Sequence, residues 1–365
     1  MRQDNLEYTN KNFIFLSFFK HLVISMVDLT LKERLKKTLN GKKVDKAPVL
    51  AVTQTGTKDL MNLTKYYWPD ANWNPKALAE LSISAHREIG FEAVRIPYCL
   101  TVLLEALGCE IEKGDTTRQA AIRGHPYNSR KPMPIGKFSE NILSKGRIPV
   151  MLQAIKLIRD KVGENVPIIA GAEGPVTIAS GLVEVTTLMR WFIREKEALG
   201  DYLKFGTDAM IEYANALFDA GADVFAVLDP VASPELINPR DFNDMVMPIY
   251  KDISNKLNGD SILHICGDIT TILPSLRESG FLGLSIEEKT DMKEAKDILG
   301  DKLRLIGNIS SASTMLNGTY NEVFEECITA LKKGTDILAP GCGLAPLTPI
   351  KNCIAMIDAR NNYFK

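Results

Sequence analysis

The chain has 365 residues, and its 44 basic and 45 acidic side chains leave a formal net charge of −1. A protein that binds nucleic acid normally carries a basic excess, so that class of protein is disfavoured. A chain of this length is long enough to bury a large core, and a single α/β barrel of this size is common.

The first 25 residues stand apart from the rest. Residues 12–27 are apolar in parts, but Lys20 and His21 interrupt them and the stretch is too short to span a bilayer. It also lacks the basic start, unbroken apolar run and cleavage site of a signal peptide. We predict that residues 1–25 are a disordered extension or the product of an upstream start site. Residues 26–365 then form the folded domain, and no part inserts into a membrane.

From residue 26 onward one pattern recurs: an amphipathic helix, a glycine and a short apolar strand. Residues 208–220 place apolar side chains on one helical face, Gly221 follows, and the strand 224–228 comes next. Residues 323–333, Gly334 and the strand 336–339 repeat the pattern. Each glycine stands where a helix ends in a left-handed conformation.

Eight strand-like runs are predicted. They lie at 47–52, 93–96, 167–172, 224–228, 261–266, 283–287, 304–308 and 336–339. Most are continuously apolar, as in parallel strands buried on both faces. Eight alternating β/α units favour an α/β fold with a single (β/α)8 barrel of the TIM type. An open doubly wound sheet is the alternative, but residues 53–56 are not the glycine-rich phosphate loop that usually follows its first strand.

The longest connection, residues 99–149, lies between the second and third predicted strands. Residues 109–112 and 119–123 resemble a small hairpin around 114–117. We predict that this segment is an insertion that lies over the mouth of the barrel.

Active sites of such barrels lie at the carboxyl ends of the strands. Polar side chains stand at every predicted strand end: Gln54, Arg95 with Tyr98, Glu173, Asp229, His264 with Cys266, Glu287 with Glu288, Asn308 and Cys342. Several of them are residue types that bind metal ions.

His264 and Cys266 lie two residues apart on a predicted strand, so their side chains point to the same side. Alone, this pair also fits a buried histidine beside an inert thiol. Cys342, in a glycine-rich turn after the last strand, adds a second thiol at the same end. Two thiolates and an imidazole suit zinc. Glu287 or Glu288 is available as the fourth ligand, although both also fit solvated charges at the rim.

The ligand types narrow the chemistry. Two thiolates make zinc a poorer Lewis acid than a histidine- and carboxylate-rich set, and a water-activating hydrolase needs an acidic zinc. A substrate thiol needs to be deprotonated yet remain nucleophilic. The predicted set therefore favours alkyl transfer to a thiol over hydrolysis.

The remaining cysteines, Cys99, Cys109, Cys327 and Cys353, are scattered and do not resemble the disulfide framework of a secreted protein. We expect them to be packing residues in a reducing, cytoplasmic protein.

The sequence from about Leu29 to its end resembles the methylcobalamin:coenzyme M methyltransferases of methanogenic archaea, which belong to the uroporphyrinogen decarboxylase superfamily. The stretches that carry the resemblance are 30–35, 52–56, 95–102, 173–177, 229–233, 263–267 and 338–343. The resemblance implies that His264, Cys266 and Cys342 bind a catalytic zinc ion, with Glu287 as the fourth ligand.

It also implies the reaction, a step of methanogenesis from methylated compounds. A methyl group moves from methyl-Co(III) of a separate corrinoid protein to the thiol of coenzyme M, giving methyl-coenzyme M and Co(I). Arg95 is then a candidate for binding the sulfonate tail, unless it pairs with a carboxylate such as Glu92.

Four further residues, Gln54, Tyr98, Asp229 and Asn308, are expected to orient the substrate or to support the zinc ligands. Metal-binding histidines usually need an acceptor on the other ring nitrogen. Asp229, on the neighbouring strand, is the expected acceptor for His264.

Three other functions stay open. A metal-free decarboxylase of the superfamily would carry an arginine in the loop after its first strand, whereas residues 53–56 contain none. A related corrinoid-dependent methyltransferase with another thiol acceptor, such as homocysteine, shares the zinc site. A corrinoid-binding module without turnover would not need the complete ligand set.

Overall fold

A computed structural model of the chain describes residues 29–127, 129, 131–137 and 141–365. The predicted extension, residues 1–25, lies outside the described residues. Seven strands form one parallel sheet in the order β1-β4-β5-β6-β7-β8-β9. Their bounds are β1 Val94–Ile96, β4 Ile168–Glu173, β5 Val224–Leu228, β6 Asp260–His264, β7 Gly283–Ser285, β8 Arg304–Ile309 and β9 Ile337–Pro340.

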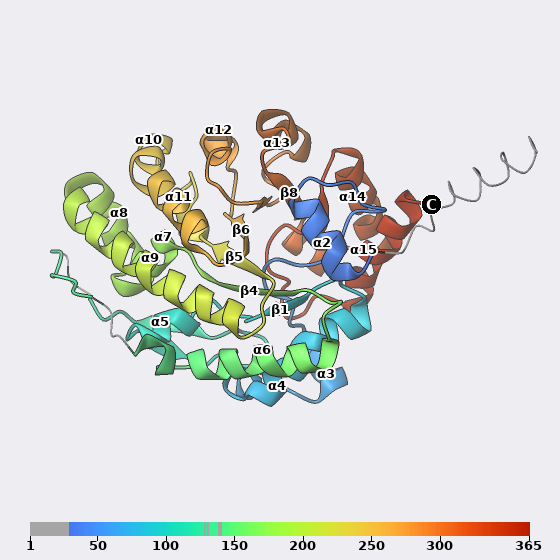
Figure 1. The fold of residues 1–365 in the computed structure, drawn as a ribbon, viewed down its shortest axis with the longest axis horizontal. Helices are drawn as coiled ribbons and strands as arrows, with labels where there is room; N and C mark the ends of the chain where they lie inside the picture. Colours follow the sequence, from blue (N-terminus) through green and yellow to red (C-terminus); the bar gives the residue numbers. More distant parts are fainter. Residues whose placement is uncertain (1–28, 128, 130, 138–140) are drawn as a thin grey trace, which may run out of the picture.

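Helices surround the outer face of this curled sheet (Figure 1). They are α2 Leu31–Leu39, α3 Lys58–Thr64, α4 Pro75–Ser84, α5 Val102–Ala106, α6 Ile148–Val162, α7 Pro175–Leu182, α8 Val185–Arg194, α9 Lys196–Asp219, α10 Pro239–Asp241, α11 Met247–Lys256, α12 Leu273–Leu276, α13 Met292–Leu299, α14 Tyr320–Lys332 and α15 Ile350–Tyr363. Gly221 and Gly334 follow α9 and α14 with φ of +117° and +98°, as the sequence predicts.

The first predicted strand, residues 47–52, differs from the prediction. It forms a single parallel bridge, between Val49 and Leu338 of β9, and is not a strand of the sheet. On its other side the carbonyl of Val49 accepts a hydrogen bond from the amide of Glu92, two residues before β1. The prediction of eight parallel strands is thus confirmed for seven, and residues 48–50 lie between the two edge strands of the sheet.

Alternation along the strands builds two apolar layers. In β5, Phe225 and Val227 face the helices, whereas Val224, Ala226 and Leu228 face the inside of the curled sheet. The inner layer also contains Leu35 and Leu39 of α2, so this helix covers the amino ends of the strands. The carboxyl ends are left open.

The long connection after β1 contains α5 and a two-stranded antiparallel sheet, β2 Glu110–Glu112 with β3 Ala121–Gly124. This is the hairpin that the sequence predicts around residues 114–117. Its neighbour Gln119 lines a pocket at the carboxyl ends of the strands, together with Cys99 and Leu100.

Among the described helices, none is by itself long and apolar enough to span a membrane. Only α7 and α8 taken together, bent by 110°, meet the criteria of length and composition.

Candidate metal centre and substrate pocket

Four possible metal ligands meet at the carboxyl ends of three strands. His264 is the last residue of β6, Cys266 lies two residues further, Glu287 lies two residues after β7, and Cys342 lies two residues after β9. One ligand atom from each lies within 4.8 Å of the others. Because the ends of parallel strands share one edge, residues 78 positions apart (264 to 342) come together here.

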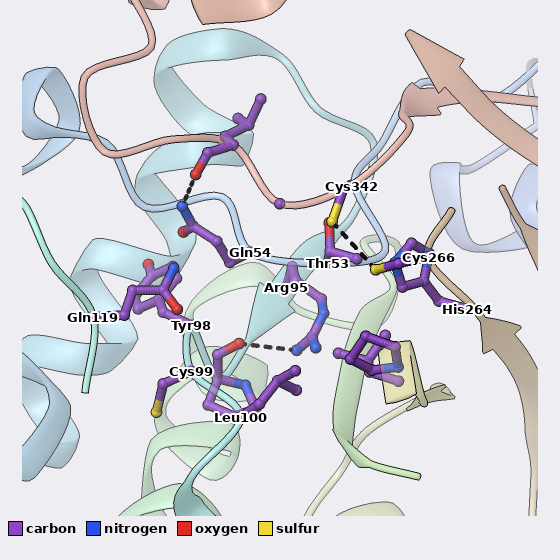
Figure 2. A pocket seen from close by; sticks show the side chains of 15 residues that line it. Thr53, Gln54, Arg95, Tyr98, Cys99, Leu100, Gln119, His264, Cys266 and Cys342 are labelled. Carbon is purple, nitrogen blue, oxygen red and sulfur yellow. Dashed lines mark hydrogen bonds between the residues drawn. The ribbon is translucent and has the colours of Figure 1, made fainter. Parts of the chain in front are cut away.

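Short contacts order the group. The sulfur of Cys266 lies 3.3 Å from Nε2 of His264 and 3.8 Å from the sulfur of Cys342. Figure 2 shows the two sulfurs facing each other beside the imidazole ring. Glu287 accepts a hydrogen bond of 2.9 Å from the amide of Gly267, through Oε2, which fixes its carboxylate beside the thiols.

The Ser311 side chain holds the backbone of Cys342 in place. Its amide donates to Oγ of Ser311, and this hydroxyl donates to the Cys342 carbonyl, both at 3.0 Å. Gly341 has an ordinary φ, so it is not there for a left-handed turn. A Cβ at Gly341 would lie 3.1 Å from Cα of Glu287, and the glycine therefore lets two ligand-bearing segments approach each other.

The electrostatics of the group favour a cation. The pKa of Cys342 is held below its ordinary value by a hydrogen bond from the Cys266 thiol and by His264. The same hydrogen bond, together with burial, raises the pKa of Cys266. Burial also raises the pKa of Glu287. Three acidic groups so close together ionise together only if a positive charge joins them.

The residues therefore fit a metal ion by their chemistry. Two sulfurs, one imidazole nitrogen and one carboxylate oxygen are donors that zinc prefers. Glu288, the other candidate for the fourth ligand, hydrogen-bonds Oγ of Ser310 at 2.8 Å and is not part of the group.

The imidazole of His264 is oriented by Ser285. Nδ1 of the ring lies 3.1 Å from Oγ of Ser285, at the end of the neighbouring strand β7. Asp229, which the sequence suggested for this role, accepts hydrogen bonds from the backbone of Val176, from Thr177 and from the Tyr250 hydroxyl. Asp229 is fully buried and binds the first turn of α7 instead.

A pocket of about 230 Å³ opens beside the four donors. It is lined by Thr53, Gln54, Arg95, Pro97, Tyr98, Cys99, Leu100, Gln119, Leu228, Pro230, His264, Cys266, Cys342, Gly343 and Leu344. Three of the predicted substrate contacts, Gln54, Arg95 and Tyr98, are in this set, and Asp229 and Asn308 are not. The Asn308 amide donates to the carbonyls of Glu287 and Thr290, so it supports the segment that carries Glu287.

Gln54 links the segment before β1 to the loop after β9. Its side-chain amide donates to the carbonyls of Leu344 and Gly56 and accepts from the Gly56 amide. Gln54 thereby anchors the loop that carries Cys342, and little of its hydrogen-bonding capacity remains for a substrate.

Sequence reasoning missed Ser285, Ser311, Thr53 and Gln119. The sequence could have indicated Ser285, because this residue ends the strand next to the one that carries His264. Ser311 begins a short helix, Ser311–Leu316, and Gln119 lies in a loop, and only the folded chain brings them to the site.

The chain belongs to the uroporphyrinogen decarboxylase family, which it matches over residues 30–363. This confirms the superfamily resemblance inferred from the sequence.

The chain is also similar to particular members of that family. It is 46% identical over 340 residues to the methylcobamide:CoM methyltransferase MtaA of Methanosarcina barkeri, covering 93% of this chain and 100% of that protein. It is 34% identical to the methylcobamide:CoM methyltransferase MtbA of Methanosarcina acetivorans, covering 93% of this chain and 99% of that protein. A solved methyltransferase from Methanosarcina mazei superposes with a TM-score of 0.90 at 46% identity, covering 92% of this chain and 100% of that one.

Proposed function

We propose that this protein transfers a methyl group from a methylated corrinoid protein to the thiol of coenzyme M, yielding methyl-coenzyme M. The observation that carries the proposal is the group of four donors, three of which, His264, Cys266 and Cys342, line a small pocket. The names of the relatives, which are methylcobamide:CoM methyltransferases, support the same reaction.

We infer that His264, Cys266, Cys342 and Glu287 hold one Zn²⁺ ion. Bound there, zinc would supply Lewis-acid activation that favours the thiolate form of the acceptor. Glu287 is the donor best suited to exchange, since it is a single carboxylate held by one backbone amide. Ser285 fixes the ring of His264, and Ser311 fixes the backbone of Cys342.

The volume of the pocket determines which of the two substrates can enter it. At about 230 Å³ the pocket is smaller than the roughly 300–1,000 Å³ of sites for drug-sized ligands. A thiol of a few heavy atoms fits, whereas a corrin ring does not. The corrinoid protein therefore presents its methyl group at the mouth. The acceptor sulfur attacks the methyl carbon, the carbon–cobalt bond breaks, and its electron pair stays on cobalt as Co(I).

The extent of the domain and its cellular setting belong to the same proposal. One domain, residues 26–365, carries the activity, and residues 48–50 complete the wall of the barrel as an eighth stave. The six free cysteines suit a reducing, cytoplasmic setting.

Metal analysis and an activity assay test the proposal together. We expect about one zinc per chain, lost in Cys342→Ser with a decrease in activity of more than about 100-fold, because changes outside the ligand shell alone cost 10–100-fold. Cys327→Ser, which changes a buried thiol of α14 that is not one of the four donors, should keep its zinc. Mixing the protein with free methylcobalamin and coenzyme M should convert the methylcobalamin spectrum to that of Co(I).

Two outcomes would contradict the proposal. Full zinc content in Cys342→Ser would remove the metal site. A spectral change with homocysteine but none with coenzyme M would indicate the related methyltransferase with another acceptor.

A further inference from the structure

Arg95 differs from the other buried arginines. Among the described residues, four arginines are less than a tenth exposed: Arg34, Arg95, Arg147 and Arg360. Three of them pair with carboxylates, namely Arg34 with Glu92, Arg147 with Glu105 and Arg360 with Glu92. Among the described residues, no carboxylate forms an ion pair with Arg95. Glu92, its expected partner, is already paired with two other arginines.

The guanidinium of Arg95 is nevertheless held in a fixed place. Nε donates to the Val52 carbonyl, and Nη1 donates to the carbonyls of Ile96 and Pro97. The third nitrogen, Nη2, makes no hydrogen bond to the described residues. It lies where a Cβ at Gly171 would be, at 2.7 Å, so only glycine at position 171 leaves room for it.

Burial lowers the pKa of Arg95 to about 10, so the guanidinium remains charged at neutral pH. A buried charge without a partner of opposite sign is costly. Three carbonyls stabilise the guanidinium through their dipoles but leave its net charge uncompensated. The missing partner is an anion that arrives from the pocket.

The pocket offers such an anion one place. Figure 2 shows the Arg95 guanidinium in the middle of the group, with the sulfurs of Cys266 and Cys342 on one side of it and Tyr98 and Gln119 on the other. Of the 15 lining residues none is a carboxylate or a lysine. An ammonium group in this cavity would face a guanidinium and find no carboxylate.

We infer that Arg95 is the anion subsite of the acceptor and that it selects a short thiol with one anionic group and no ammonium. The thiol end of this inference rests on the proposed function, and the anion end does not. Arg95 binds the anionic tail through Nη2 and opposes zwitterionic and cationic thiols by repulsion, so attraction and repulsion act in the same residue.

A ligand without a thiol tests the subsite by itself. Titration calorimetry with ethanesulfonate should show binding to the wild type and at least about 10-fold weaker binding to Arg95→Met, since hydrogen bonds to charged groups are stronger than those between neutral groups. Arg123→Met removes an exposed arginine of β3 and should bind like the wild type. Equal binding by the wild type and Arg95→Met would overturn the inference.

A series of acceptors of similar length tests the selectivity. With free methylcobalamin as donor, the wild type should prefer 2-mercaptoethanesulfonate over 2-mercaptoethanol by about 100-fold in kcat/KM, and cysteamine should be poorer still. Arg95→Met should reduce the first ratio below about 3-fold, and Arg95→Lys should keep part of it. A wild type that uses the neutral and anionic thiols equally well would refute the selectivity, even if Arg95→Met fails to fold.

The binding experiment and the acceptor series test the anion subsite and the proposed function independently. Binding of ethanesulfonate that depends on Arg95, without methyl transfer to any thiol, would refute the proposed function and keep the subsite. Methyl transfer that ignores the acceptor's charge would do the reverse.

Discussion

The two ends of the interior of the curled sheet are built by the same strands but differ in chemistry. At the closed end, beneath α2, the inner layer contains a cluster of apolar side chains that includes Ile262, Ile306 and Ile337. At the open end the same strands finish in His264 and in the loops that carry Glu287 and Cys342. Ile262 and His264 lie two residues apart on β6 and face the same side. Depth along one strand thus separates the residues that hold the fold together from those that act on a ligand.

The partners of the polar groups sharpen this comparison. At the open end Oε1 of Glu173 is buried without a hydrogen-bond partner among the described residues. Arg95 likewise lacks a carboxylate there. Such groups lower stability, and at a candidate site they indicate a role in function rather than in folding. Substitutions at the two ends should therefore affect different quantities.

The largest effect on stability is expected at the closed end. Ile306 is fully buried in the inner layer, and Ile306→Ala should lower the free energy of unfolding by about 2–5 kcal/mol by leaving a cavity. Zinc content and binding of ethanesulfonate should stay unchanged at temperatures where the variant is folded. Urea unfolding measures the loss, and Ile193→Ala, at a position that is 78% exposed, should change stability by less than about 0.5 kcal/mol.

One result would contradict the expected independence of the two ends. Loss of zinc from folded Ile306→Ala protein would show that the closed end also sets the geometry of the open end.

An effect of opposite sign is expected at Glu173. Burial raises its pKa from 4.5 to about 7, so the folded protein keeps a proton that the unfolded chain releases. The stability of the wild type should therefore fall as the pH rises from about 4.5 to 7 and then stop falling. Glu173→Gln removes this penalty and should be more stable at pH 8 by on the order of 3 kcal/mol, with little difference near pH 4.5.

Unfolding curves of wild type and variant at several pH values check this prediction, because the difference between them removes the titration of other groups. Glu325→Gln, an exposed position on α14, should show no such pH-dependent gain. A Glu173→Gln protein that is less stable than the wild type at pH 8 would show that the carboxylate has a stabilising partner.

A smaller effect should follow from Ser285→Ala. The hydroxyl orients the ring of His264, and the loss of such an interaction typically weakens metal binding by 10–100-fold. We expect about 10-fold weaker zinc binding, measured by competition with a chelator. Asp229→Asn, which alters the residue that sequence reasoning favoured, should leave zinc affinity unchanged in the folded protein. The opposite ranking of the two variants would restore Asp229 as the partner of His264.

Much of the fold was predictable because the strands are short apolar runs that alternate with amphipathic helices. The prediction for 224–228 matches β5, and seven of the eight predicted strands exist. Apart from the missing strand at 47–52, the errors lie at strand ends. Residues 265–266 and 286–287 were assigned to strands, but β6 ends at His264 and β7 at Ser285, since the ladder stops before the loops that carry Cys266 and Glu287.

The candidate site was predictable in its donors but not in their supports. Histidine and cysteine are rare enough at strand ends to signal a metal site from residue type alone. Hydrogen bonds from Ser285 and Ser311, the approach of Gly171 to Arg95 and the isolation of Glu173 depend on contacts across the barrel. No local pattern in the sequence encodes those distances.

The donors join the chain in a fixed order during synthesis. Cys266 and Cys342 are 76 residues apart, which corresponds to about 4–15 s at 5–20 residues per second. Throughout that interval a nascent chain has His264 and Cys266 but lacks the second thiol. The interval is even longer for residues 48–50, because their partner in β9 is synthesised almost 290 residues later. Assembly of the four donors and pairing of residues 48–50 with β9 are therefore both late events, because each requires β9 or the loop that follows it.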